Sequence, residues 1–116
     1  MTRYHKGRRF EYQVKRWLEN NGYLVLRTAG SHGFADLIAV GKLGEVIFFQ
    51  LSYKFEKARY DTLQDIAWER KIHIIYLVKE ERKKDWIFYD VSFGQTYSKT
   101  EYEERYCYKR CYKDCK

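Results

Sequence analysis

Residues 29–52 read AGSHGFADLIAVGKLGEVIFFQLS, and this stretch decides the fold. A loop that contains glycine and serine leads to Asp36, an acid at the start of a short apolar strand. A GKLG turn then leads to a second strand, residues 45–53, which is apolar almost throughout. An apolar run of this kind is typical of a strand that is buried on both faces at the centre of a sheet. Towards its end this strand carries two polar side chains on one face, Gln50 and Ser52.

The composition limits the class of protein. The chain has 116 residues, which suffice for one compact domain with a modest core. Its 23 basic residues against 16 acidic ones give a formal net charge of +7, which favours nucleic acid or an acidic membrane surface as a partner. No apolar run approaches the ~20 residues of a membrane span, and the N-terminal residues contain no signal-peptide core. We therefore expect a cytoplasmic protein with no membrane partner.

The rest of the chain supplies helices and strands around this stretch. Apolar residues recur at the spacing of one helix face over 8–21, and Gly22 is suited to end that helix as a left-handed cap. A second helix is expected over 57–70. The remaining strands are expected over 23–28, 36–40, 73–78 and 86–91. The predicted order is α-β-β-β-α-β-β, an α/β fold with a mixed central sheet flanked by helices.

Four segments carry a resemblance to a known family. They are RYHKGRRFE at 3–11, RTAGSHG at 27–33, DLIA at 36–39 and the strand with Gln50. In this order and spacing the chain resembles the Holliday-junction resolvases of archaea and their viruses, and the resolvase-like nucleases of the wider PD-(D/E)XK superfamily. The resemblance implies a restriction-endonuclease-like fold, with a resolvase-like nuclease-fold domain over residues 1–93. Residues 94–116 are expected to form a basic tail rich in Tyr and Cys.

The resemblance also implies a metal site. In that family two acids and a third group on the central strand hold one or two Mg²⁺ ions, with Mn²⁺ as an alternative. By position the ligands are Glu11, Asp36 and Gln50, whose amide oxygen can bind a hard cation without adding charge. Structural alternatives remain for each of them. Glu11 would be a solvated helix residue, Asp36 would close a turn, and Gln50 would bind the backbone.

One position departs from the family pattern. A lysine that orients or deprotonates the attacking water is expected where Ser52 stands, and a serine hydroxyl is a poor base near neutral pH. Lys54 lies two residues further on, so a continuing strand would place it on the same face as Gln50 and Ser52. Lys54 is therefore the candidate for a displaced catalytic lysine. Its alternatives are a phosphate contact or a solvated strand end.

Basic residues near the first helix predict a DNA-binding surface. The expected contacts to the phosphate backbone are Arg3, Lys6, Arg8, Arg9, Arg27 and Ser31. The alternative interpretation is that this cluster is a solvated charged face. No base-reading motif is present, which fits recognition of DNA shape.

Two functions follow from these features. The first is a DNA-binding protein of resolvase-like fold, structure-selective for branched or duplex DNA, in which catalysis is weakened or lost. The second is an active Mg²⁺-dependent endodeoxyribonuclease that uses Lys54 in place of the missing lysine. Either protein is expected to act as a homodimer, and the first could assist an active nuclease partner.

The C-terminal tail repeats cysteine every fourth residue. On a helix, Cys107, Cys111 and Cys115 would form one stripe. An odd number of cysteines permits a disulfide across a dimer, although disulfides are rare inside cells. The other reading, which we favour by a small margin, is a basic and partly disordered helix with reduced thiols.

Overall fold

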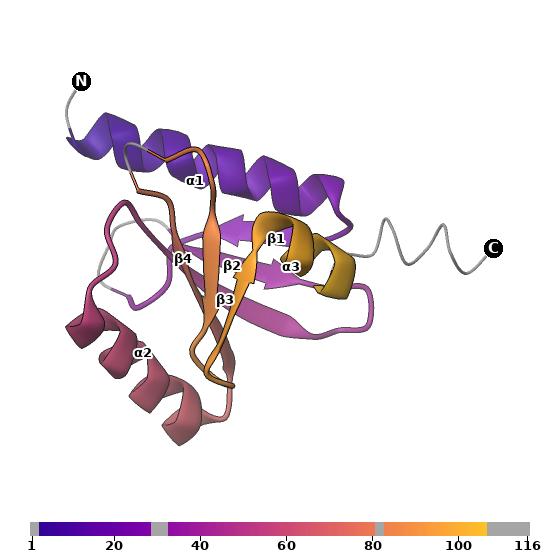
Figure 1. Cartoon of the computed structure of the whole chain (residues 1–116). Coiled ribbons are helices and arrows are strands. Elements are labelled where there is room, and N and C mark those ends of the chain that lie inside the picture. Colours follow the sequence, from indigo (N-terminus) through magenta and orange to yellow (C-terminus); the bar gives the residue numbers. More distant parts are fainter. Residues whose placement is uncertain (1–2, 29–32, 81–82, 107–116) are drawn as a thin grey trace.

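The computed structural model describes residues 3–28, 33–80 and 83–106, with side chains from residue 8 onward. Figure 1 shows a single sheet between helices. In chain order the elements are α1 (Arg3–Asn20), β1 (Leu24–Arg27), β2 (Leu37–Val40), β3 (Val46–Ser52), α2 (Lys57–Arg70), β4 (His73–Val78), β5 (Ile87–Asp90), β6 (Gln95–Ser98) and α3 (Lys99–Tyr106). The α/β class and the mixed central sheet expected from the sequence are confirmed.

The order of strands in the sheet follows the order in the chain. β1, β2 and β3 form one antiparallel meander, and β4, β5 and β6 form a second one. The two meanders meet at β3 and β4, which run parallel from the pair Ile47–His73 to the pair Ser52–Val78. Because parallel neighbours need a crossover connection, α2 lies between these two strands in the chain. The C-terminal ends of β3 and β4 therefore lie at the same end of the sheet.

One face of the sheet is covered by α1 and α3. Phe10, Val14 and Leu18 of α1 are buried against this face, as their helical spacing predicts. α1 ends at Asn20, and Gly22 follows as the left-handed cap that the sequence predicts, with a φ of +97° that glycine adopts without strain. The amide of Tyr23 donates to the Leu18 carbonyl at 3.1 Å, which satisfies one of the last helical carbonyls.

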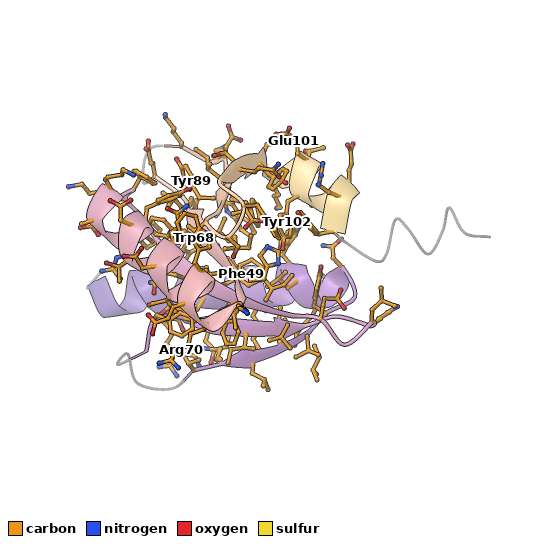
Figure 2. The ribbon with its side chains drawn as sticks, turned by 90° about the horizontal axis from the view of Figure 1, so that it is seen from below. Phe49, Trp68, Arg70, Tyr89, Glu101 and Tyr102 are labelled. Carbon is orange, nitrogen blue, oxygen red and sulfur yellow. The ribbon has the colours of Figure 1, made fainter. Side chains whose placement is uncertain are left out.

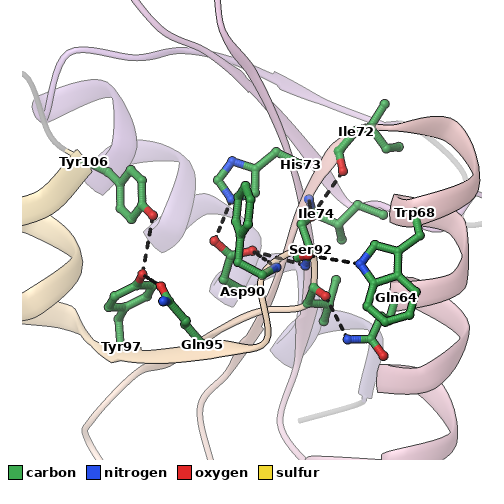
Figure 3. Close-up of polar contacts among 12 residues, drawn as sticks. Gln64, Trp68, Ile72, His73, Ile74, Asp90, Ser92, Gln95, Tyr97 and Tyr106 are labelled. Carbon is green, nitrogen blue, oxygen red and sulfur yellow. Dashed lines mark hydrogen bonds and ion pairs between the residues drawn. The ribbon is translucent and has the colours of Figure 1, made fainter.

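The opposite face is covered by α2. Leu63 and Ala67 are buried in a second apolar cluster on this side. Polar contacts also fix the helix to the turn after β5 (Figure 3). The indole Nε1 of Trp68 donates to the Ser92 carbonyl, and Nε2 of Gln64 donates to the Val91 carbonyl, each at 3.0 Å. No described helix has the length and apolar character needed to cross a membrane.

The structure adds β6 and α3 to the elements expected from the sequence. The sequence predicted residues 95–106 to be part of the C-terminal tail. Tyr97 and Tyr102 are instead buried in the same apolar cluster as residues of α1. Tyr102 stacks on Phe88 of β5, with ring centroids 4.4 Å apart and an interplanar angle of 11°. The ring of Phe49 also contacts that of Tyr102, and Figure 2 labels both residues. Residues 107–116, which include the three cysteines, lie outside the described residues.

Candidate active site

Asp36 is held between two strands by its own backbone. Its amide donates to the Phe49 carbonyl of β3 at 2.8 Å, and its carbonyl accepts from the amide of Thr28, just after β1, at 3.0 Å. The hydroxyl of Thr28 also donates to the carbonyl of Ala35 at 2.8 Å. These contacts place the acid at the end of the sheet where β1 and β3 finish and β2 begins.

The side chains of Asp36 and Gln50 are in direct contact. Nε2 of Gln50 donates to Oδ2 of Asp36 at 3.0 Å, and the amide of Leu51 donates to the same oxygen at 2.9 Å. Nε2 also donates to the Leu51 carbonyl at 3.2 Å. Since both contacts of the Gln50 amide use its nitrogen, Oε1 is the atom that remains for another ligand.

The charge of Asp36 is incompletely satisfied. Burial raises the pKa of this carboxyl, while the Leu51 amide and the positive charge of Arg59 on α2 lower it, and the net direction is upward. Among the described residues no donor reaches Oδ1. A cation beside the carboxylate would offset the cost of burying its charge.

Asp90, an acid that is fully buried, provides a contrast. Both oxygens of Asp90 have partners, as Figure 3 shows in part. Oδ2 lies 2.8 Å from Nε2 of His73, and Oδ1 accepts from the amides of Ser92 and Phe93 at 3.2 and 3.3 Å. Asp90 thus serves the turn after β5, whereas Asp36 retains an oxygen that structure formation does not use.

Glu11 is engaged in an ion pair. Its Oε1 accepts from Nε of Arg27 at 3.1 Å and lies 3.0 Å from another guanidinium nitrogen of the same residue. The guanidinium carbon of Arg27 also lies 4.8 Å from the ring centre of Tyr12. Because Arg27 pairs with Leu37 in the sheet, Glu11 is anchored at the same end of the sheet as Asp36. It approaches from the α1 side, while Gln50 faces the side of α2.

Ser52 and Lys54 form a tight local turn. The hydroxyl of Ser52 donates to the Lys54 carbonyl at 2.7 Å, and the Lys54 amide donates to that hydroxyl at 3.1 Å. The phenol of Tyr76 donates to the same carbonyl at 3.0 Å. Because β3 ends at Ser52, the alternation of strand faces does not extend to Lys54, whose position is set by the turn.

The basic residues of the N-terminus lie on a helix that starts earlier than expected. α1 begins at Arg3, five residues before the start expected at residue 8, because apolar periodicity does not detect a polar first turn. Arg8 and Arg9 therefore lie within the helix, and Arg9 is exposed. The side chains of Arg3 and Lys6, and all of Ser31, lie outside what the structure describes.

The acids do not form a compact carboxylate cage. Within the described residues no group of three or more His, Cys, Asp and Glu side chains is arranged to hold a metal ion. The oxygens that suit a hard cation are instead one carboxylate, one side-chain amide and one backbone carbonyl, from Asp36, Gln50 and Leu51. The chemistry of these oxygens suits Mg²⁺ or Mn²⁺, while the described contacts place Nε2 of Gln50, and not its Oε1, against the carboxylate and the carbonyl. Arg59, whose charge acts on Asp36, carried no signal in the sequence because its approach depends on the packing of α2.

This mixed sheet, with Asp36 before β2 bonded to Gln50 of β3, has the architecture of the restriction-endonuclease-like class of folds. Hjc of Archaeoglobus fulgidus, a Holliday junction resolvase from an archaeal hyperthermophile, has this fold: the TM-score is 0.56 at 20% identity, over 84% of this chain and 87% of that chain. The family model of the archaeal Holliday junction resolvases (Hjc) matches residues 2–102. The chain therefore belongs to the Hjc family, as its sequence resemblance predicted.

A curated relative is similar over a shorter segment. The crossover junction endodeoxyribonuclease Hjc of Methanocaldococcus jannaschii is 44% identical over 64 residues. The match covers 55% of this chain and 47% of that protein, so it spans about half of the relative's length.

Proposed function

We propose that the chain is a structure-selective binding protein for branched DNA and that its catalysis is weakened or lost. The observation that carries this proposal is the turn at Ser52. The hydroxyl that stands at the lysine position is bonded to both the amide and the carbonyl of Lys54. A positioned acid–base group of this kind typically contributes ~10²–10⁴ to the rate, and Ser52 supplies neither its charge nor its basicity.

DNA binding is supported by charge and by family membership. The net charge of +7 favours a polyanion, and the counterions that such a protein releases from DNA drive association. We assign the phosphate contacts to Arg3, Lys6, Arg8, Arg9, Arg27 and Ser31. Arg27 would divide its guanidinium between Glu11 and DNA. The proposal includes a homodimer, which would present two such surfaces to a branched substrate, and an active nuclease as a further partner.

The metal site belongs to the same proposal. Asp36 and Gln50 would hold one Mg²⁺ or Mn²⁺ ion, with the Leu51 carbonyl as a further ligand, and Glu11 would complete the site after leaving Arg27. When bound, such an ion makes a water more acidic and offsets charge on the scissile phosphate. The hydrogen bond from Gln50 to Asp36 would orient both side chains. With its nitrogen held there, Gln50 presents Oε1 to the ion.

An active endonuclease is the alternative function, and one observation favours it. The chain keeps a half-buried carboxylate at the family's metal position, with one oxygen that no described donor reaches, and a cation there would offset the desolvation that raises its pKa. In this alternative Lys54 takes the role of the missing lysine. Its ammonium group forms no ion pair with a described residue, so it is available to reach back over the turn.

Cleavage of a labelled four-way junction separates the two functions. The wild type, Asp36→Ala, Ser52→Lys and Lys54→Gln are compared in Mg²⁺ and in Mn²⁺, and binding is measured in parallel by fluorescence anisotropy. We expect the wild type to bind the junction without cutting it and Ser52→Lys to cut it. Cutting by the wild type that both Asp36→Ala and Lys54→Gln abolish would instead establish the endonuclease.

A further inference from the structure

A basic hollow lies between α1 and the segment that follows β4. It measures about 430 Å³ and is lined by Gln13, Arg16, Trp17, Asn20, Lys79, Lys84, Trp86 and Lys99. Four of these residues are cations and none is an acid. None of the four, Arg16, Lys79, Lys84 and Lys99, forms a salt bridge with a carboxylate in the described part of the chain.

The neighbouring hollow differs in charge. It shares Lys84, Trp86 and Lys99 with the basic one, but three carboxylates also line it: Glu80, Asp85 and Glu101. One of these, Glu80, forms an ion pair with Lys83 at 3.4 Å. The unbalanced positive charge is therefore confined to the hollow against α1. Carboxylates lie nearby, because Lys84 and Lys99 also line the neighbouring hollow and Glu103 accepts a hydrogen bond from Nε1 of Trp17 at 2.7 Å. None of these acids lines the basic hollow, so an anion there would relieve the repulsion among its four cations.

The position of Lys99 indicates which part of a nucleic acid this hollow can hold. Its ammonium nitrogen lies 4.3 Å from the ring centre of Trp86 and 5.8 Å from that of Trp17. The lysine thus covers the face of Trp86 on which a base would stack. The site presents ammonium and guanidinium groups, and these suit phosphate oxygens.

The basic hollow lies beside the candidate active site. The amide of Lys79 donates to the carbonyl of Ser52 at 3.0 Å, so the hollow begins next to the end of β3. On its other side, the ring of Trp86 contacts Phe10, the residue before Glu11, at a centroid distance of 5.8 Å. A DNA strand that passes the end of the sheet at Asp36 would therefore continue towards these cations.

We propose that this hollow is a second phosphate-binding site, which holds the backbone of a DNA arm beyond the candidate active site. The proposal rests on the proposed function for its DNA partner. It adds Arg16, Lys84 and Lys99 to the contacts expected from the sequence, and it assigns them to backbone phosphate instead of bases. Each phosphate neutralised by a cation releases counterions, so the site would contribute to the salt dependence of binding.

The test compares Lys84→Gln/Lys99→Gln with a control that removes the same charge elsewhere. Arg70→Gln/Lys71→Gln is suitable, because both residues are exposed at the opposite end of the sheet, where α2 leads into β4. Anisotropy with a labelled four-way junction is measured over a range of NaCl in EDTA, which removes any metal contribution. We expect the hollow variant to bind about tenfold more weakly, with a salt slope lower by about two, and the control to show smaller changes. Equal losses in both variants would overturn the proposal.

A second variant and a second probe distinguish failure of the phosphate site from failure of the proposed DNA-binding function. Arg16→Gln/Lys84→Gln leaves the contact of Lys99 with Trp86 intact, so its loss of binding would not reflect altered packing. Inorganic phosphate is titrated in parallel and followed through the amide NMR signals of Lys84 and Lys99. If the wild type bound no junction, the proposed function would fail. Even then, phosphate-induced shifts in the wild type that disappear in Arg16→Gln/Lys84→Gln would support the anion site. The absence of such shifts in the wild type would overturn it.

Discussion

Gln50 donates a hydrogen bond from Nε2 to Oδ2 of Asp36 at 3.0 Å, and the amide of Leu51 donates to the same oxygen at 2.9 Å. Both donors satisfy one oxygen of the carboxylate and leave the other unused. The pair is therefore a hydrogen-bonded arrangement that is stable without metal and still offers two oxygens, Oδ1 of Asp36 and Oε1 of Gln50.

Replacing Gln50 with glutamate is expected to lower the stability of the metal-free protein and to increase its stabilisation by Mn²⁺. Gln50→Glu removes the donor to Asp36 and places two carboxylates together, so the metal-free protein should lose about 1–3 kcal/mol of stability. Mn²⁺ should recover that loss and raise Tm more than in the wild type. Calorimetric Tm with and without Mn²⁺ measures both effects.

Gln64→Glu is the matched control for this change. Gln64 also donates from Nε2, to the Val91 carbonyl at 3.0 Å, but it has no part in the candidate site. A Mn²⁺-dependent rise in Tm as large in Gln64→Glu as in Gln50→Glu would contradict a metal site at Asp36.

Asp36→Asn should stabilise the metal-free protein at neutral pH. Burial raises the pKa of Asp36 in the folded state, so the folded state disfavours the ionised form relative to the unfolded state. This cost is fully present above the raised pKa and disappears as the pH falls below the unfolded value. The gain in Tm should therefore shrink on acidification. Tm measured from pH 7 to pH 3 checks this, with exposed Asp65→Asn as the control for loss of a carboxylate at the surface.

Much of the fold can be predicted from the sequence, but the end of the chain cannot. The bounds expected for α2 and β4 are those observed. Apolar residues recur on one helical face of α2, and β4 is a short continuous apolar run, typical of a buried strand. β6 and α3 were not predicted because their buried residues are tyrosines among polar and charged neighbours. Such a sequence is typical of an exposed segment. Tyr102 belongs to the core because the ring packs on Phe88 and Trp17, contacts that the local sequence does not reveal.

The contacts among the candidate site residues could not be predicted from the sequence. Asp36 and Gln50 could be selected from the sequence, yet their hydrogen bond depends on the pairing of β2 with β3. The pairing of Glu11 with Arg27 likewise arises from where α1 crosses the sheet. The place of Lys54 depends on the strand ending at Ser52, which a period-two pattern does not reveal.

Truncation of Tyr102 should be strongly destabilising. Its side chain is fully buried against Phe88 and the α1 cluster, so Tyr102→Ala is expected to cost about 3–5 kcal/mol, as for other large aromatic truncations. Urea unfolding followed by circular dichroism gives the value. Phe93→Ala, at a position that is 70% exposed, should change stability far less, and a similar loss in both would argue against a core role for α3.

The turn at Ser52 predicts a cost for restoring the family's lysine. Ser52→Lys removes a hydroxyl that bonds both the amide and the carbonyl of Lys54, so we expect a loss of about 1 kcal/mol. Ser52→Thr keeps the hydroxyl and should remain close to the wild type. Urea midpoints of the three proteins provide the comparison. They also ensure that any change in junction cleavage is measured on folded protein.

Because the strand order follows the chain order, the chain divides into two consecutive halves of the sheet. Everything up to Ser52 builds one half of the sheet, everything from His73 builds the other, and a single parallel ladder with α2 joins them. The proposed metal ligands all fall in the first half, while three of the four cations of the basic hollow fall in the second. The first half also contains the phosphate contacts expected from the sequence, so substitutions there would affect both the proposed metal site and DNA binding. Substitutions of Lys79, Lys84 or Lys99 would instead alter DNA binding from the half that holds no proposed metal ligand.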